Sequence, residues 1–113
     1  MLTNRIRKLS LLKSNEMKNG IIYPDSPSAK EVGFSSDLFT GYLWKEDQLI
    51  IISLITSKKE KQGFVKGLFD NIRILGFDIF VPCPSNRMFS ICLRYGMEPT
   101  LINGCEGMYF TNI

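Results

Sequence analysis

The sequence predicts an α/β fold with a mixed, mostly antiparallel central sheet flanked by helices. Aromatic and β-branched residues dominate segments 38–45 and 48–56, which flank Glu46-Asp47 and indicate an antiparallel hairpin. Downstream, two segments with helical apolar spacing each end at a glycine, and a short apolar run, residues 77–81, lies between them. A strand, helix, strand and helix in this order favour a parallel strand beside the hairpin.

The first third of the chain has the weakest pattern. Residues 2–17 fit either an amphipathic helix or a strand followed by a short helix. Residues 21–23 predict a short extended segment. A short helix through about Val32 should follow, because Asp25 or Ser26 can accept hydrogen bonds from its first turn.

The second half is more regular. Segment 48–56 is apolar at nearly every position, which predicts a central strand covered on both faces. After a lysine-rich loop, we expect a helix over 64–75 and, after the strand at 77–81, a helix over 86–95. Residues 97–113 should hold one or two strands with a turn between them.

Length and charge limit the function classes. The 113 residues have room for one domain, residues 1–113, and a homodimer is one way for so short a domain to gain stability. The net charge of +3, from 14 basic and 11 acidic residues, is a small excess, so we do not expect a nucleic-acid partner. Four lysines surround a glycine in the loop and favour a phosphate-bearing ligand; they are Lys58, Lys59, Lys61 and Lys66.

Cysteine and histidine content argues against a metal site. The three cysteines have no C-x-x-C spacing and the chain contains no histidine, so no metal is expected. An odd cysteine count without a signal-peptide pattern fits a reducing compartment, and the longest apolar run is too short to span a bilayer. We therefore expect a cytoplasmic protein with no membrane partner.

The loop before the 64–75 helix holds a specific pattern. With Ile55 at the end of the preceding strand, the loop ends in Glu60-Lys-Gln-Gly-Phe-Val65, and the apolar helix positions follow without a gap. The later segment Ser85-Asn-Arg-Met-Phe-Ser-Ile-Cys-Leu-Arg-Tyr-Gly-Met97 ends in Gly-Met. Both resemble GNAT-type N-acetyltransferases, whose loop reads Gln/Arg-x-x-Gly-x-Gly/Ala and whose later helix ends in Gly-Phe. The resemblance covers about the last two thirds of the chain.

This resemblance implies a GNAT-like fold and an acyl-CoA-dependent N-acyltransferase that uses acetyl-CoA as cosubstrate. The acceptor would be an amine on a small molecule or on a protein. Backbone N–H groups at the helix N-terminus would receive the pyrophosphate, and the pantetheine would follow the end of the preceding strand. The implied cofactor-binding residues are Ile55, Ser57, Lys61, Gln62, Gly63, Phe64, Val65, Lys66 and Asn86.

The same segments depart from the family pattern at catalytic positions. Cys92 stands where the family commonly has its acid tyrosine, and Tyr95 lies one helical turn farther on, so these two are the candidate catalytic residues. Glu60 replaces a phosphate-binding residue, Val65 replaces a small one, and segment 48–56 has no carboxylate to act as a base. These departures leave an alternative: a catalytically inactive GNAT-like protein-interaction module that acts through its hairpin or through dimer contacts.

Overall fold

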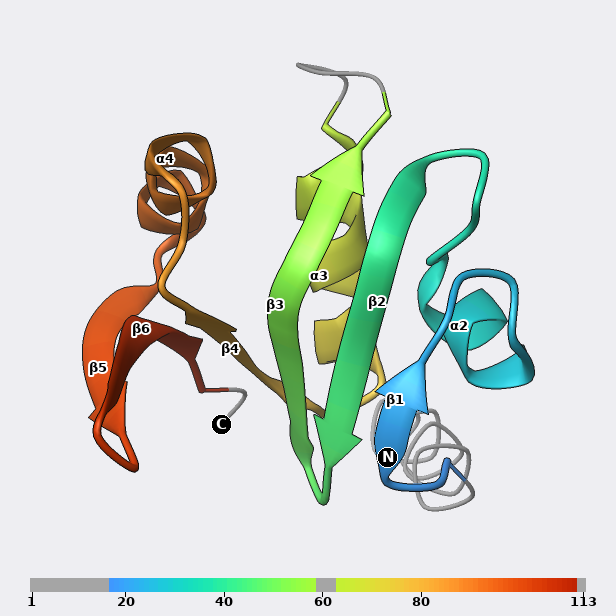
Figure 1. Ribbon diagram of the computed structural model, residues 1–113, viewed down its shortest axis with the longest axis horizontal. Coiled ribbons are helices and arrows are strands. Elements are labelled where there is room, and N and C mark those ends of the chain that lie inside the picture. The colour runs from blue at the N-terminus through green and yellow to red at the C-terminus, as the bar shows by residue number, and fades with distance from the viewer. Residues whose placement is uncertain (1–16, 59–62, 112–113) are drawn as a thin grey trace, which may run out of the picture.

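The computed structural model describes residues 17–58 and 63–111, and in them it contains three helices and a six-stranded sheet (Figure 1). The strands are β1 (Gly20–Ile22), β2 (Phe39–Glu46), β3 (Leu49–Ser57), β4 (Asp78–Pro82), β5 (Glu98–Ile102) and β6 (Cys105–Phe110). Their order across the sheet is β1-β2-β3-β4-β6-β5. Only β3 and β4 run parallel; the other neighbours are antiparallel. The prediction of a mixed, mostly antiparallel α/β sheet is confirmed.

The helices are α2 (Pro27–Val32), α3 (Phe64–Ile74) and α4 (Asn86–Tyr95). Ser26 and Ser85 cap the N-termini of α2 and α4, since each hydroxyl oxygen accepts a hydrogen bond from a backbone N–H of the first turn. Gly33 and Gly96 end the same two helices in the left-handed conformation. The helix boundaries predicted from serine caps and terminal glycines are therefore confirmed.

All three helices share one core with the sheet. In Figure 1, α3 lies behind β2 and β3, and α3 contacts β3, β4, α2 and α4. The core side chains come from every layer and include Leu43, Ile50, Ile52, Ile79, Val81, Leu68, Phe69, Ile72 and Cys92. Alternation along β2 and β3 directs these strand residues toward the helices and their neighbours toward the opposite face.

The opposite face of the sheet is open in the described part of the chain. Trp44 and Leu54 point to that face, and their side chains are 42% and 60% exposed. The prediction that segment 48–56 is covered on both faces is therefore wrong: β3 buries its helix-facing side chains Ile50 and Ile52 but exposes Leu54. An apolar run is typical of a strand buried on both faces, yet here it belongs to a strand with helices on one side.

A β-bulge changes the direction of the side chains halfway along β3. Tyr42 pairs with Leu54 while Trp44 pairs with Ile51, so two residues of β3 face the single residue Leu43 of β2. The extra residue shifts the alternation, and Ile55 beyond the bulge points into the core as Ile50 does before it. The bulge thus lets both halves of β3 bury apolar side chains on the helix side.

Candidate functional site

The parallel strands β3 and β4 separate partway along their length. Leu49–Ile51 pairs with Asp78–Phe80, and the pairing then stops although β3 continues to Ser57 and β4 to Pro82. Beyond this point β3 pairs only with β2, and β4 pairs only with β6. In the described part of the chain, residues 52–56 of β3 therefore lie beyond its pairing with β4. The helix α3 begins after this edge, as the upper part of Figure 1 shows.

The N-terminus of α3 is formed by Gly63. Gly63 adopts the left-handed conformation, with φ of 75°, and a Cβ added there would meet nothing within 4 Å. Because glycine has no side chain, the N-cap residue itself satisfies none of the first-turn N–H groups. The side chain of Val65 is buried and that of Lys66 is exposed. A helix N-terminus of this kind has the partial positive charge that attracts anions.

The other predicted cofactor-binding residues that the structure describes differ in burial and lie on different elements. Ile55 packs against the core, as does Phe64, and Ser57 is half-buried at the end of β3. Asn86 is exposed at the start of α4, on a different element from Gly63. The predicted ligands Lys61 and Gln62 lie outside the described residues, and so does Glu60.

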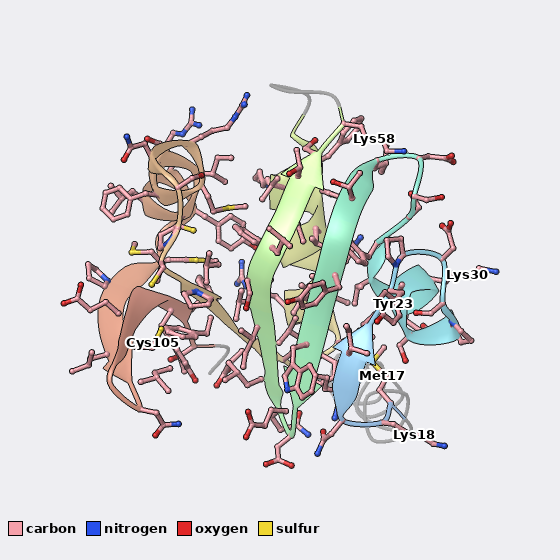
Figure 2. The ribbon with its side chains drawn as sticks, in the orientation of Figure 1. Met17, Lys18, Tyr23, Lys30, Lys58 and Cys105 are labelled. Carbon is pink, nitrogen blue, oxygen red and sulfur yellow. The ribbon has the colours of Figure 1, made fainter. Side chains whose placement is uncertain are left out.

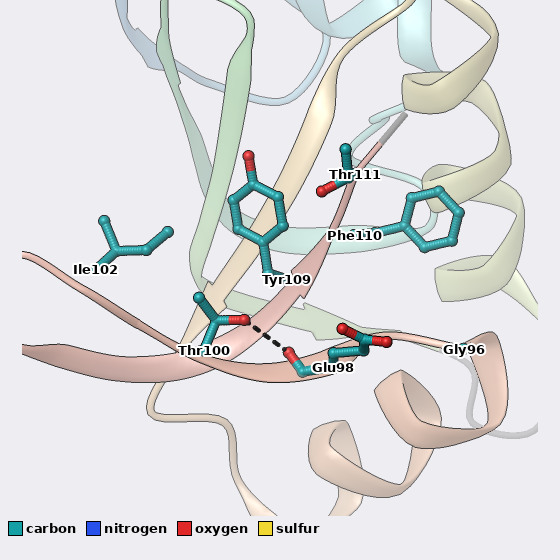
Figure 3. Close-up of a pocket in the computed structure, with 7 residues that line it drawn as sticks. All are labelled: Gly96, Glu98, Thr100, Ile102, Tyr109, Phe110 and Thr111. Atoms are coloured by element: carbon teal, nitrogen blue, oxygen red, sulfur yellow. Dashed lines mark hydrogen bonds between the residues drawn. The ribbon is translucent and has the colours of Figure 1, made fainter. Parts of the chain in front are cut away.

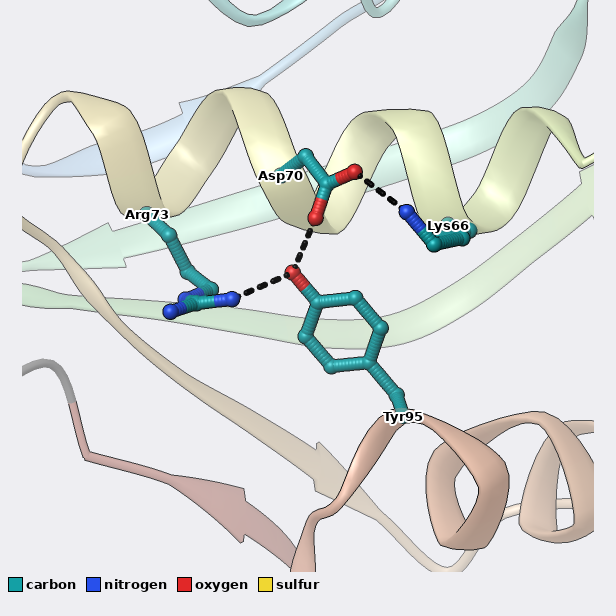
Figure 4. A network of polar contacts seen from close by, with 4 residues as sticks. All are labelled: Lys66, Asp70, Arg73 and Tyr95. Carbon is teal, nitrogen blue, oxygen red and sulfur yellow. Dashed lines mark hydrogen bonds and ion pairs between the residues drawn. The ribbon is translucent and has the colours of Figure 1, made fainter.

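Tyr95 belongs to a polar network between α4 and α3 (Figure 4). The Tyr95 hydroxyl donates to Asp70 Oδ1 at 2.5 Å and accepts from Arg73 Nη1 at 3.2 Å. The other carboxylate oxygen of Asp70 is 2.8 Å from Lys66 Nζ. The Tyr95 ring packs edge-on against Phe69, with centroids 5.0 Å apart. The hydroxyl of Tyr95 is thus directed at α3.

The network changes the proton affinities of its members. Hydrogen bonds from Lys66 and then from Tyr95 lower the pKa of Asp70, so this carboxylate stays ionised. Burial, and then the hydrogen bond to Asp70, raises the pKa of Tyr95. Tyr95 therefore remains a protonated donor at neutral pH, and it must leave Asp70 before it can donate to a substrate.

Cys92, the other candidate catalytic residue, has a different environment. Its side chain is 0% exposed and belongs to the hydrophobic core. Burial raises the pKa of the thiol to about 11. A fully buried thiol with this pKa is a small core side chain, since it neither contacts solvent nor ionises at neutral pH. The geometry therefore favours Tyr95 over Cys92 as a group that could act on a substrate.

Two shallow hollows lie around β5 and β6. One, of about 520 Å³, is lined by Gly96, Glu98, Thr100, Ile102, Tyr109, Phe110 and Thr111 (Figure 3). The second, of about 650 Å³, is lined by Cys83, Pro84, Asn86, Phe89, Pro99, Thr100, Leu101, Glu106, Gly107 and Met108. Among the predicted site residues that the structure describes, Asn86 alone lines one of these two hollows. Sequence reasoning missed them because their walls come from separate segments.

Tyr109, which lines the first hollow, forms a tyrosine–carboxylate pair with Asp78. The Tyr109 hydroxyl donates to Asp78 Oδ2 at 2.8 Å, and the Tyr109 ring packs against Phe80. Burial, and then the hydrogen bond to Asp78, raises the pKa of Tyr109 to about 12. The pair joins β6 to β4 across the open face of the sheet.

We expect the Tyr109–Asp78 pair to make stability fall at high pH. An unfolded tyrosine ionises near pH 10, so between about pH 10 and 12 the unfolded chain releases a proton that folded Tyr109 keeps. The free energy of unfolding, measured in urea across this window, should fall more steeply in the wild type than in Tyr109→Phe. Asp78→Asn should move the tyrosinate absorbance of Tyr109 to lower pH. Equal slopes in wild type and Tyr109→Phe would contradict the assignment.

No family model matches the chain, and no curated protein or solved structure matches it either. Within residues 17–58 and 63–111, no group of three or more metal-ligating side chains is positioned to hold a metal ion. The helices in this part of the chain lack the length and apolar character needed to cross a membrane.

Proposed function

We propose that this protein is an acyl-CoA-dependent N-acyltransferase of GNAT type that transfers the acetyl group of acetyl-CoA to an amine. The observation that carries the proposal is the separation of β3 and β4 beyond Ile51, with the N-terminus of α3 following the free end of β3. A splayed pair of parallel strands followed by an anion-attracting helix N-terminus is the arrangement that the GNAT resemblance implies. The glycine register of the loop supports it independently.

In this proposal the α3 N-terminus binds the pyrophosphate of acetyl-CoA. The first-turn N–H groups after Gly63 donate to phosphate oxygens, and the open space around Gly63 admits them. Lys66 adds positive charge by exchanging Asp70 for a phosphate. Its ion pair with Asp70 is an exposed i,i+4 contact, and surface pairs of this kind contribute little to stability. Releasing Lys66 from Asp70 to bind a phosphate therefore costs little free energy.

The thioester arm follows the free edge of β3. Residues 52–56 lie beyond the pairing of β3 with β4, so an extended pantetheine chain can lie there as an added strand would. In this proposal, a backbone N–H at the bulge opposite Leu43, where the regular ladder is interrupted, polarises the thioester carbonyl. The amine attacks that carbonyl, the C–N bond forms, the C–S bond breaks, and a water carries the amine proton away. Rate enhancement then rests mainly on orientation.

The first test is calorimetric titration of acetyl-CoA into the purified protein and into two variants of Gly63. Gly63→Glu and Gly63→Gln have side chains of similar size in the same left-handed backbone, and they differ in one negative charge. We expect the wild type to bind and Gly63→Glu to bind at least tenfold more weakly than Gly63→Gln. Equal loss in both variants would mean that the charge next to the helix N-terminus is irrelevant.

The two variants must also be folded for the comparison to hold. Their melting temperatures should agree with each other, since their backbone strain is the same. An absence of binding by the wild type near millimolar acetyl-CoA, with no shift of its melting temperature, would overturn the proposed cofactor.

An inactive GNAT-like interaction module remains the second candidate, and one observation favours it. The open sheet face exposes Trp44 and Leu54, with Ile21 beside Trp44 on β1 at 42% exposure. An exposed apolar patch of this kind is typical of a protein-contact surface. Acetyl-CoA binding without transfer to any amine in a small-molecule and peptide panel would favour the module.

A further inference from the structure

Two of the three cysteines lie side by side although they are far apart in the sequence. Cys83 follows the last residue of β4, and Cys105 is the first residue of β6. The β4–β6 pairing extends one residue past Pro82, because the backbone N–H of Cys83 donates to the carbonyl of Glu106 at 3.0 Å. Cys105 lies in the β5–β6 hairpin, on the opposite side of the molecule from Tyr23 (Figure 2).

The thiols of Cys83 and Cys105 occupy the same small volume. Cys83 Sγ is 3.8 Å and Cys105 Sγ is 3.7 Å from the carbonyl oxygen of Glu106. The two thiols also interact electrostatically, since Cys83 contributes to the raised pKa of the Cys105 thiol. Cys83 is exposed and Cys105 is half-buried, whereas Cys92 is buried in the core. Cys83 and Cys105 are therefore an accessible dithiol, and Cys92 is shielded from solvent.

The backbone of Cys83 is what brings its sulfur to Cys105. In a regular continuation of β4, Cys83 would point to the face opposite that of Pro82. Cys105 shares a face with Gly107, the partner of Pro82, so regular alternation would separate the two sulfurs. Cys83 instead has φ of 43°, a left-handed conformation that is uncommon for a non-glycine residue. Such conformations persist where the surrounding structure holds them, often at functional positions.

We propose that Cys83 and Cys105 form a redox-active pair that closes to an intramolecular disulfide by exchange with a low-molecular-weight disulfide such as oxidised glutathione. The exposed Cys83 attacks first as its thiolate, forming a mixed disulfide and releasing one glutathione. The Cys105 thiolate then attacks Cys83 Sγ, the protein disulfide forms, and the second glutathione leaves. Two protein thiols are oxidised and one disulfide is reduced to two thiols, with the two protons ending on glutathione.

The properties of Cys105 suit the second step. Burial, and then the contact with Cys83, raises the pKa of the Cys105 thiol. The part of this shift that Cys83 causes ends when Cys83 becomes a mixed disulfide, so Cys105 can then lose its proton and attack Cys83 Sγ as a thiolate. The bridge would join the end of β4 to the start of β6 at the rim of the second hollow, which Cys83 and Glu106 line. The pair does not depend on the acetyl-CoA proposal.

The test is oxidation of the reduced, full-length protein with oxidised glutathione, followed by thiol titration and peptide mapping under non-reducing conditions. Before oxidation, two thiols should react in the native protein, and the third, Cys92, should react only after denaturation. After oxidation, none should react in the native state, one should react after denaturation, and a Cys83–Cys105 linked peptide should be recovered. The melting temperature should rise, because the bridge restricts the unfolded chain.

Matched variants separate the pair from a single reactive cysteine. Cys92→Ala should still form the bridge. Cys83→Ser should lose the linked peptide, and Cys105→Ser should stop at the mixed disulfide with glutathione. A wild-type protein that keeps glutathione on Cys83, or that forms only disulfides between two copies of the chain, would overturn the proposal.

Discussion

Replacing Gly41 with alanine should destabilise the protein by roughly 3 kcal/mol or more. Gly41 pairs with Ile55 just beyond the bulge and has φ of 101°. A Cβ at this position would lie 1.9 Å from the carbonyl oxygen of Leu54 and 2.9 Å from Cα of Ile55. Both contacts are with backbone, so no change of side-chain rotamer can relieve them. The loss is a large part of the ~5–15 kcal/mol that typically stabilises a domain.

Gly67→Ala is the matched control for Gly41→Ala. Gly67 lies inside α3, and a Cβ added there would meet nothing within 4 Å. Alanine should stabilise the helix by about 0.5–1 kcal/mol because it lowers the backbone entropy lost on folding. Urea unfolding of both variants should therefore shift the midpoint in opposite directions. A Gly41→Ala midpoint equal to that of the wild type would contradict the described approach of β2 to β3.

If Gly41→Ala still folds, measuring its affinity for acetyl-CoA tests whether the segment of β3 around Ile55 takes part in the proposed binding. The clash lies next to Ile55, on the part of β3 that has no β4 partner. Displacing this segment should weaken binding, whereas Gly67→Ala should leave binding unchanged. If the proposed function is correct, stability and acetyl-CoA binding both depend on this short stretch of backbone.

Local signals in the sequence were sufficient to predict most of the elements. Ser26 and Ser85 cap the N-termini of helices, and Gly33 and Gly96 end the same helices. These interactions join residues within about one turn of each other, so the local sequence is enough to predict them. The hairpin was predicted for the same reason: Asp47 lies between two strongly β-forming segments. Prediction succeeded where the determining contact is close in sequence.

The features that decide the site are long-range. Tyr95 bonds to Asp70 across 25 residues, and Tyr109 bonds to Asp78 across 31. Neither partner could be named from spacing or composition. The length over which β3 pairs with β4 also has no local signal, and neither does the absence of a helix over the face that carries Leu54 in the described part of the chain.

The loop that carries the GNAT resemblance is described only at its helix end, residues 63–65. Gly63 adopts the left-handed conformation that favours glycine, which gives a structural reason for glycine at this position. The side chain of Val65 is buried rather than directed at solvent. Val65 therefore contributes to the core beneath the helix.

Phe69→Ala should cause the second large loss, about 3–5 kcal/mol. Phe69 is 0% exposed on the sheet-facing side of α3, and its ring packs edge-on against Tyr95. Truncation removes a large apolar side chain and leaves a cavity between α3, α4 and the sheet. Phe89→Ala is the matched control, since Phe89 is 39% exposed on α4, and its loss should stay below about 1 kcal/mol. Both are measured by urea unfolding.

Phe69→Leu separates the loss of buried apolar volume from the loss of the aromatic contact with Tyr95. Leucine keeps most of the apolar volume but has no ring edge to meet Tyr95, and aromatic pairs stabilise by about 0.5–1.5 kcal/mol beyond burial. We therefore expect Phe69→Leu to lie between the wild type and Phe69→Ala. Because the same ring holds Tyr95 where its hydroxyl reaches Asp70, Phe69→Leu should also loosen that hydrogen bond. Equal losses for Phe69→Leu and Phe69→Ala would mean that Tyr95, and not the buried volume, is what Phe69 supports.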